Sequence, residues 1–338
     1  MIFVLVFATG FLIALVLTPL TARLALRTGA VDQPRHRHQH AKPTPKLGGL
    51  PLFVALCAAI GVSLLYPRTD TYEMPRLAGL FLGSALMFVV GAYDDHRELH
   101  AMPQLIAQTI AAAIAVASGV MIREISSPFD GQLVPFEAWF AALLTFFWLV
   151  GMMNTINWLD GIDGLAAGVV VIAGFMLFVH TYHLGQNSLA LLALALIGSI
   201  LGFLLFNFYP AQLFMGSAGA NVLGFALGAL SIIGGAKVGT ALLVLGIPIL
   251  DVAWQIINRL RAGRSPFSAD RGHLHHRLLD MGLSQRVIVF LYYALTVCFG
   301  ALALWLPSGI YKLIALVIIG TGALLVLVNL QSDFTRRE

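Results

Sequence analysis

The sequence consists of long apolar runs separated by short polar loops, and this alternation restricts the possible folds more than any other feature. Runs of about 17 to 25 mostly apolar residues are typical of helices that cross a lipid bilayer. Such runs lie at 2–26, 47–65, 77–92, 103–121, 138–156, 162–182, 188–206, 219–234, 238–257, 288–306 and 310–330. The sequence therefore predicts an all-α fold, a polytopic membrane helix bundle of about 11 transmembrane helices.

The composition excludes an ordinary soluble domain. The 338 residues are 59% hydrophobic and only 11% charged, whereas charged residues make up about 25% of a typical soluble domain. Neither a linker nor an internal repeat divides the chain, so we expect a single membrane domain over residues 1–338. The first apolar run is longer than the core of a signal peptide and lacks a cleavage pattern, which favours a retained helix.

The basic residues predict how the helices are oriented. If the loops after the first, third, fifth, seventh and ninth runs lie on one side with the C-terminal tail, that side holds fifteen of the twenty Lys and Arg residues. Cytoplasmic loops are enriched in these residues, so we expect this side to face the cytoplasm. The same bias accounts for the net charge of +4. No nucleic-acid motif is present, and we expect no nucleic-acid partner.

The segment 151–168 places ionisable side chains between two apolar runs. Its polar residues recur every three positions: Asn154, Asn157, Asp160 and Asp163. Carboxylates at membrane depth are costly and indicate functional sites. Because a straight helix would spread these residues over about half a turn, we expect Gly161 and Gly164 to break the chain between two helices. The segment is interpreted as a ligand-coordinating site at the membrane boundary.

Two further clusters lie on the same predicted side. Asp94 and Asp95 end the third run, and adjacent carboxylates suit a hard divalent cation that also binds phosphate oxygens; a solvated acidic turn is the alternative. A glycine-rich segment, 216–219, precedes the eighth run, with Ser217 as the expected N-cap. Backbone N–H groups at such a helix start favour anions, including phosphates, although the glycines equally suit close helix packing.

Two loops on this side are rich in basic side chains. The loop 31–51 contains Arg37 among alternating histidines, and its prolines predict an extended conformation. The loop 261–282 contains three histidines among arginines: His273, His275 and His276. In the loop 261–282 such donors suit a diphosphate or a sugar, with zinc binding as the alternative. In the loop 31–51 the alternatives are lipid headgroups or topogenic charge, an anionic phosphate substrate, and a metal site. Asp251, in the ninth run, is expected to pair with a basic residue.

Taken in order, these motifs resemble those of one family. They are the DD pair at 94–95, NTINWLDGIDGLAAG at 154–168, FNFYPAQLFMG at 206–216, DRGHLHHRL at 270–278 and a DxPxxRxxHxxPxPxxGG pattern over 32–49. They are similar to the motifs of the polyprenyl-phosphate N-acetylhexosamine-1-phosphate transferases, glycosyltransferase family 4. The HLHH segment looks more like the undecaprenyl-phosphate N-acetylglucosamine-1-phosphate transferase branch than the branch that uses UDP-muramoyl pentapeptide.

The resemblance implies a reaction. N-acetylglucosamine-1-phosphate or a similar sugar-1-phosphate passes from a UDP-N-acetylhexosamine to undecaprenyl or another polyprenyl phosphate, and UMP is released. This step initiates cell-envelope polysaccharide synthesis. The resemblance implies Mg²⁺ as the cofactor, with Mn²⁺ as the alternative, and a multi-pass protein of the cell (plasma) membrane whose active site faces the cytoplasm. The oligomeric state is left open, with a homodimer as one alternative.

The resemblance also assigns roles to individual residues. Catalysis falls to four carboxylates: Asp94, Asp95, Asp160 and Asp163. The expected metal ligands are Asp94, Asp95 and Asp160. Substrate binding falls to Asn157, Ser217, Arg37, Arg259, Arg271, His273, His275 and His276. Because two anions meet when the acceptor phosphate attacks the donor diphosphate, charge neutralisation and positioning should dominate catalysis.

The chain departs from the family pattern at several charged positions. Where the family usually has FMGD, this chain has Ser217 after FMG. Gln104 stands in place of a lysine after the DD pair, Gln212 in place of the lysine of a PAK segment, and His38 in place of a basic residue. The joint loss of opposite charges fits mutual compensation in an active transferase. The alternative is a catalytically impaired relative that binds polyprenyl phosphate or a nucleotide sugar.

Overall fold

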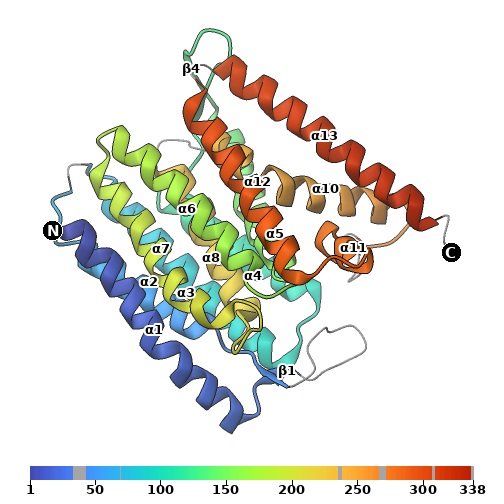
Figure 1. The fold of residues 1–338 in the computed structure, drawn as a ribbon. Coiled ribbons are helices and arrows are strands. Elements are labelled where there is room, and N and C mark those ends of the chain that lie inside the picture. Colours follow the sequence, from blue (N-terminus) through green and yellow to red (C-terminus); the bar gives the residue numbers. More distant parts are fainter. Residues whose placement is uncertain (33–42, 69, 235–237, 266–271, 307–308, 336–338) are drawn as a thin grey trace.

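The structure, a computed structural model, describes the chain except residues 33–42, 69, 235–237, 266–271, 307–308 and 336–338. Helices make up most of the molecule (Figure 1). They are α1 (Ile2–Thr28), α2 (Gly49–Ser63), α3 (Glu73–Arg97), α4 (Ala101–Ala117), α5 (Ala138–Leu159), α6 (Leu165–His183), α7 (Asn187–Asn207), α8 (Gly216–Ile233), α9 (Val238–Val244), α10 (Gly246–Arg261), α11 (Leu274–Asp280), α12 (Gln285–Trp305) and α13 (Gly309–Thr335).

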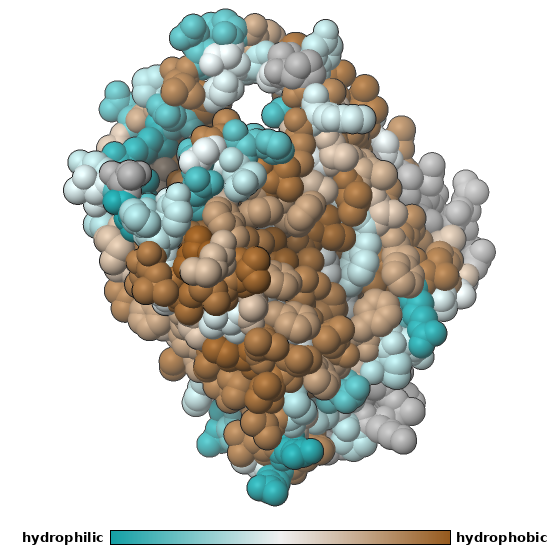
Figure 2. Space-filling model, turned by 60° about the vertical axis from the view of Figure 1, so that its left-hand side comes forward, coloured by the Kyte–Doolittle hydropathy of each residue, from teal (hydrophilic) through white to brown (hydrophobic). Residues whose placement is uncertain are grey.

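In the part of the chain that the structure describes, seven helices are long and apolar enough to cross a membrane: α1, α3, α5, α6, α7, α8 and α12. Shorter apolar helices lie at Gly49–Ser63, Ala101–Ala117 and Gly309–Gly322. Figure 2 shows an apolar surface over most of one face, with hydrophilic residues gathered towards its ends. The all-α, multi-pass membrane bundle is confirmed, while the count of about 11 crossings stays a prediction.

The ninth apolar run was expected to form one transmembrane helix, but the structure divides it into two. It forms α9 and α10, which meet at a bend of 81°. Pro248, the third residue of α10, has no N–H and so cannot bond to the carbonyl of Val244, the last residue of α9. Hydropathy reports only that both halves are apolar, so it did not reveal the change of direction.

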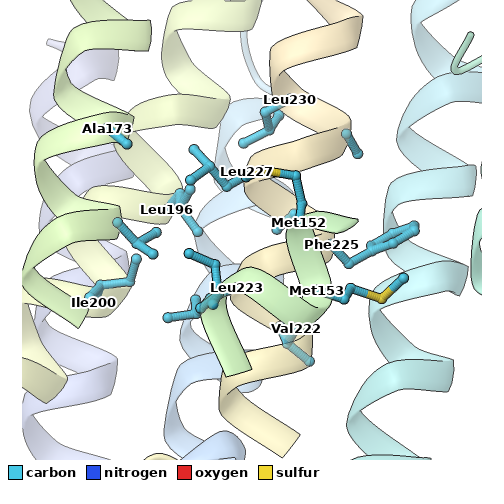
Figure 3. Packing of buried hydrophobic residues seen from close by; sticks show 14 of the residues in the cluster. Met152, Met153, Ala173, Leu196, Ile200, Val222, Leu223, Phe225, Leu227 and Leu230 are labelled. Atoms are coloured by element: carbon cyan, nitrogen blue, oxygen red, sulfur yellow. The ribbon is translucent and has the colours of Figure 1, made fainter. Parts of the chain in front are cut away.

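α8 is the central helix of the bundle. Almost every residue from Gly216 to Ile233 is buried, and its side chains meet those of α5, α6 and α7 in the apolar core (Figure 3). The glycines of α8 allow neighbouring backbones to approach. A Cβ at Gly224 would lie 2.7 Å from the carbonyl oxygen of Met152 on α5. The bundle is therefore built around a helix with little side-chain bulk.

The strands form small antiparallel pairs. β1 (Val31–Asp32) pairs with β2 (Thr44–Pro45), and β3 (Glu124–Ser126) pairs with β4 (Leu133–Pro135). The β1–β2 pair confirms an extended conformation at the base of the first loop, but Arg37 lies outside the described residues. The Pro45 carbonyl accepts a hydrogen bond from the Phe214 N–H at 2.9 Å. This bond holds the loop base against the connection between α7 and α8.

The contact between α3 and α8 gives a test of the packing. A Cβ at Gly91 of α3 would lie 2.4 Å from the Ala218 Cα, whereas a Cβ at Gly61 of α2 would meet nothing within 4 Å. Overpacking of this kind costs about 1–3 kcal/mol. We expect Gly91→Ala to lower the melting temperature of the detergent-solubilised protein and Gly61→Ala to leave it unchanged or raise it. Equal melting temperatures for the two variants would contradict the close approach of these helices.

Candidate active site

Asp95, near the end of α3, caps the start of α8. Its Oδ1 accepts a hydrogen bond from the Ser217 N–H at 2.7 Å, and its Oδ2 accepts one from the Ala218 N–H at 3.1 Å. Unpaired N–H groups at a helix start carry partial positive charge, so a carboxylate there is stabilised. The Lys46 Nζ lies 3.3 Å from the same Oδ1. The helix start does bind an anion, and this anion is a side chain of the protein itself.

The predicted role of Ser217 as the N-cap is wrong. α8 begins at Gly216, and Met215 holds the cap position without a side-chain hydrogen bond. Gly216 has a φ of 71°, which glycine adopts without strain, and a Cβ there would lie 2.5 Å from the Asp95 Oδ2. Because Asp95 reaches the helix start from α3, the chain at α8 does not need a hydroxyl cap of its own.

Asp94 is held by donors on either side of the turn after α3. Its Oδ1 accepts hydrogen bonds from the Leu99 N–H at 2.7 Å and from the Gln104 Nε2 at 2.9 Å. Glu98, the residue that ends α3, has a φ of 49°, and this left-handed conformation turns the chain into α4. Gln104 is therefore a neutral donor to Asp94, where the family resemblance implies a lysine.

A chain of amides runs behind these carboxylates. Asn154 of α5 donates to Gln108 of α4 at 2.8 Å, and Gln108 donates to Asn221 of α8 at 3.0 Å. Asn221 in turn donates to the carbonyl of Ser217 at 2.8 Å. Hydrogen bonds between apolar helices are a common means of holding them together. These bonds fix α4 and α5 relative to the start of α8, where Asp95 binds.

The predicted break between the fifth and sixth apolar runs is confirmed. Residues 160–164 connect α5 and α6, and Gly164 has a φ of 78°. Asp163 Oδ2 accepts a hydrogen bond from the Ala211 N–H at 2.9 Å. From α12, the Tyr293 hydroxyl donates to the Gly164 carbonyl at 2.6 Å. The α5–α6 connection is thus held by the connection between α7 and α8 and by α12.

Asp160 follows α5 directly and lies in an acidic environment. Burial, together with the negative charges of Asp95 and Asp163, raises the pKa of the Asp160 carboxyl well above its usual range, and the nearby Lys46 only partly opposes this. Carboxylates that repel one another in a partly desolvated site favour a cation. The charge distribution therefore suits a bound cation near Asp160 and Asp95.

The carboxylates of the site suit Mg²⁺ if the protein supplies only some of its ligands. Mg²⁺ prefers one or two carboxylates and takes its remaining ligands from water and phosphates. Among the described residues, no group of three or more His, Cys, Asp or Glu side chains is placed to hold a metal ion. Asp95 and Asp160 could supply two carboxylates to a cation that also binds substrate phosphates. The full predicted ligand set, which adds Asp94, stays a prediction.

The histidine loop, residues 272–276, lies over the α5–α6 connection. His275 is 1% exposed, and a Cβ at Gly161 would lie 2.3 Å from its Nε2. Its ring stacks on that of His273 with centroids 5.8 Å apart and lies 4.2 Å from that of His276. Within the described residues, neither His275 ring nitrogen has a hydrogen-bond partner. A buried imidazole with unused nitrogens therefore lies next to the acidic segment.

Asp251 and Arg259 connect this loop to the helices. Asp251 Oδ2 lies 2.9 Å from the His273 Nδ1, which confirms the expected pairing with a basic residue. The Arg259 guanidinium lies 5.1 Å from the centre of the Trp158 ring, and the His273 ring lies 5.5 Å from the same tryptophan. Trp158, near the end of α5, therefore brings Arg259 and the histidine loop together.

The structure gathers most of the predicted site residues at one end of the bundle. Contacts described above join Asp94, Asp95, Asp160, Asp163, Ser217, Arg259, His273, His275 and His276 into neighbouring clusters. Asn157 lies on α5 one turn before the acidic segment and is partly buried. Arg37 and Arg271 lie outside the described residues, so their predicted contacts with phosphate are not tested.

Sequence reasoning missed Lys46 and Trp158. Burial would lower the pKa of Lys46, but the negative charges of Asp95, Asp32 and Asp94, with the hydrogen bond to Asp95, together outweigh that effect, so the pKa is raised and the amine stays charged. The signal was available, because Lys46 falls within the PxPxxGG part of the N-terminal pattern. Trp158 carried no comparable signal, since an aromatic residue at the end of an apolar run is usually a packing residue or a membrane anchor.

A cavity of about 160 Å³ lies beside this site, between α4 and α5. It is lined by Leu99, Ala101, Gln104, Leu105, Gln108, Asn154 and Trp158. Its amides belong to the hydrogen-bonded groups that reach Asp94 and Ser217. On the outer surface of α4, Met102 and Ile106 are exposed, as lipid-facing side chains are. The lining of the cavity thus combines amides of the site with apolar residues of α4, Ala101 and Leu105.

The fold and the site together define a multi-pass membrane protein with an acidic, histidine-flanked site at one end of a helix bundle. Comparison with known proteins gives the family. The sequence matches the glycosyl transferase family 4 over residues 77–235. The chain is 37% identical, over 90% of its length and 85% of the relative's, to the probable undecaprenyl-phosphate N-acetylglucosaminyl 1-phosphate transferase of Bacillus subtilis. The chain therefore belongs to glycosyl transferase family 4.

Other members of the family are similar over much of the chain. The decaprenyl-phosphate N-acetylglucosaminephosphotransferase of Mycolicibacterium smegmatis is 36% identical over 80% of this chain and 73% of its own length. The undecaprenyl-phosphate alpha-N-acetylglucosaminyl 1-phosphate transferase of Yersinia pestis is 29% identical over 82% of this chain and 76% of its own length. Each matched region extends well beyond a single motif.

The burial of His275 predicts a loss of stability in acid. Burial, and the neighbouring His276 and His273, hold the pKa of His275 well below its usual range. Above about pH 6.5 the residue is neutral in both the folded and the unfolded chain, but below it only the unfolded chain binds the proton. At about pH 5.5 this favours unfolding by about 1.4 kcal/mol. We expect the melting temperature to fall between about pH 7.5 and about pH 5.5.

The His275→Gln variant should show a smaller decrease over the same pH interval, because the titrating group is gone. His183→Gln is the matched control, since His183 is exposed at the end of α6. The expected order is a reduced pH dependence for His275→Gln and an unchanged one for His183→Gln. The reverse order would show that His275 is not held neutral by burial.

Proposed function

We propose that the protein transfers N-acetylglucosamine-1-phosphate from UDP-N-acetylglucosamine to undecaprenyl or another polyprenyl phosphate. An oxygen of the acceptor phosphate forms a bond to the β-phosphorus of the donor. The bond from that phosphorus to the bridging oxygen breaks, and UMP leaves. The observation that carries the proposal is the convergence of Asp95, Asp160, Lys46 and the histidine loop at one end of a bundle. The relatives named for this transfer match the chain over most of its length.

In this proposal the cationic, imidazole and carboxylate side chains have different roles. Lys46, with an amine that stays protonated, and Arg259 are placed to offset phosphate charge. The unused nitrogens of His275 and the ring of His273 are placed to bind the donor's diphosphate or sugar. Asp160 and Asp163 lie on the connection beneath them and suit the nucleotide sugar and its cation. Such preorganised charges stabilise a transition state in which negative charge is spread over phosphoryl oxygens.

Mg²⁺ is the proposed cofactor, with Mn²⁺ as the alternative. Asp95 and Asp160 would hold it together with Asp94, and the ion would neutralise charge on the phosphoryl oxygens. Lys46 already contacts Asp95, so the protein supplies one positive charge at this position itself. That charge reduces the repulsion between the carboxylates before substrate binds.

The proposal extends to the membrane arrangement. The basic residues support a plasma-membrane protein whose site faces the cytoplasm, and the shorter apolar helices support about 11 crossings. The cavity between α4 and α5 suits the phosphate end of the acceptor. Its lining includes the amides of Gln104 and Asn154, and α4 also carries the exposed apolar residues Met102 and Ile106. A lipid chain in the bilayer could thus lie beside a headgroup held in the site. A homodimer is compatible with this arrangement.

The transfer reaction can be tested directly. Purified protein with Mg²⁺, undecaprenyl phosphate and labelled UDP-N-acetylglucosamine is expected to release UMP and form a chloroform-soluble labelled product. Asp160→Asn should lower the rate at least about a hundredfold, as expected for the loss of a charge aimed at the transition state. The absence of product with a panel of UDP-sugars and with both metals would exclude the transferase function. Retained binding of UDP-sugar or lipid phosphate would then favour the catalytically impaired relative.

Ser217 gives a test of charge compensation. Its N–H lies 2.7 Å from Asp95 Oδ1, so a carboxylate at this position would stand beside Asp95 at the start of α8. A carboxylate is a better partner for a hard cation than a hydroxyl. We expect Ser217→Asp to reach half-maximal activity at a Mg²⁺ concentration several-fold lower, with Ser217→Asn as the neutral control. Identical Mg²⁺ requirements in the two variants would show that this position does not contribute to cation binding.

A further inference from the structure

Three buried polar residues follow one face of α10. Asp251, Gln255 and Arg259 are 4%, 3% and 4% exposed, and their spacing of four residues places them on the same side of the helix. Each contacts a group outside α10: Gln255 donates to the Gly272 carbonyl, and Arg259 lies over the Trp158 ring. Asp251 contacts the two residues that follow Gly272. This face of α10 therefore holds the beginning of the histidine loop.

Asp251 fixes both a side chain and the backbone of that loop. Its Oδ2 lies 2.9 Å from the His273 Nδ1, and its Oδ1 accepts a hydrogen bond from the Leu274 N–H at 2.9 Å. His273 holds the N-cap position of α11. A single buried carboxylate thus determines where the helix after the loop starts and how the capping histidine is turned.

The same contact restricts the chemistry of His273. An ionised carboxylate only accepts hydrogen bonds, so beside an ionised Asp251 the proton of this hydrogen bond would lie on the Nδ1 of His273. The Nε2 is then the nitrogen with which His273 can meet a ligand, because the partner of one ring nitrogen determines the role of the other. Packing of the ring against Trp158, at 5.5 Å between centroids, limits its rotation.

We propose that Asp251 is a positioning residue for the transfer reaction. It fixes the tautomer and the orientation of His273, and it anchors the loop so that the His273 Nε2 meets the donor's diphosphate. This inference rests on the proposed function. Asp251 acts through His273 rather than on substrate, because its carboxylate is turned to His273 and Leu274 and the residue is 4% exposed.

Substitutions on α10 separate the orientation of the His273 ring from the anchoring of the histidine loop. Asp251→Asn keeps an oxygen for the Leu274 N–H but offers an amide donor to His273, which then places its proton on Nε2. We expect this variant to lower kcat by about tenfold or more while KM for UDP-N-acetylglucosamine changes by less than about twofold. Gln255→Ala loses the bond to Gly272 and should raise KM while kcat stays within about threefold of the wild type.

A double-mutant cycle distinguishes positioning from a general structural role. If Asp251 acts through His273, Asp251→Asn should cause no further loss of kcat in a His273→Ala background. Multiplicative losses in the double variant would overturn the proposal. So would a wild-type kcat for Asp251→Asn alone.

A second measurement does not depend on transferase activity. Arg264 is exposed between the end of α10 and the histidine loop, and trypsin cleavage there reports how firmly the histidine loop is anchored. Asp251→Ala, which loses both hydrogen bonds, should be cleaved faster than the wild type, while Asp251→Asn should be cleaved at close to the wild-type rate. If the wild type makes no lipid-linked product, the proposed function fails, whereas equal cleavage of all three proteins would show that the anchoring fails.

Discussion

The site depends on one physical constraint, the need to satisfy the backbone N–H groups at the buried start of α8. A helix enclosed on all sides cannot leave these groups to water, and an unpaired buried donor is costly. Asp95 reaches them from α3, and Lys46 contacts the same carboxylate. The hydrogen bonds from the start of α8 to Asp95 therefore also hold the end of α3, with both of its aspartates, beside the α5–α6 connection.

This arrangement gives a physical reading of the charges that the chain lacks relative to its family. Ser217 lies where a carboxylate is usual, yet its backbone N–H still binds Asp95. Gln104 lies where a lysine is usual, yet it donates to Asp94. At Gln104 the hydrogen bond comes from the side chain that replaces the lysine, whereas at Ser217 it comes from the backbone and does not depend on the side chain. For the Ser217 and Gln104 pair, one negative and one positive charge are lost beside the same two aspartates, so this pair fits mutual compensation; Gln212 and His38 add two further lost positive charges that it does not offset.

The sequence predicted some elements of the site better than others. The break at residues 160–164 was predictable because four polar residues with a period of three cannot share one helix face, and glycine at 164 permits the turn. The bend between α9 and α10 was missed because hydropathy treats the run 238–257 as one apolar segment, although Pro248 lies in its middle, and it carries no direction. Ser217 was misread as a cap because the true cap, Asp95, lies more than a hundred residues earlier in the chain.

By itself, the sequence determined the membrane bundle, the side on which the polar clusters gather and the residues that carry charge. These properties follow from hydropathy and from the cost of placing charges in lipid, which are local properties of a segment. Only the tertiary structure decided which group each carboxylate meets: Asp95 the start of α8, Asp163 the Ala211 N–H, and Asp251 the ring of His273. Such pairings depend on how the helices cross, and a one-dimensional pattern does not contain that geometry.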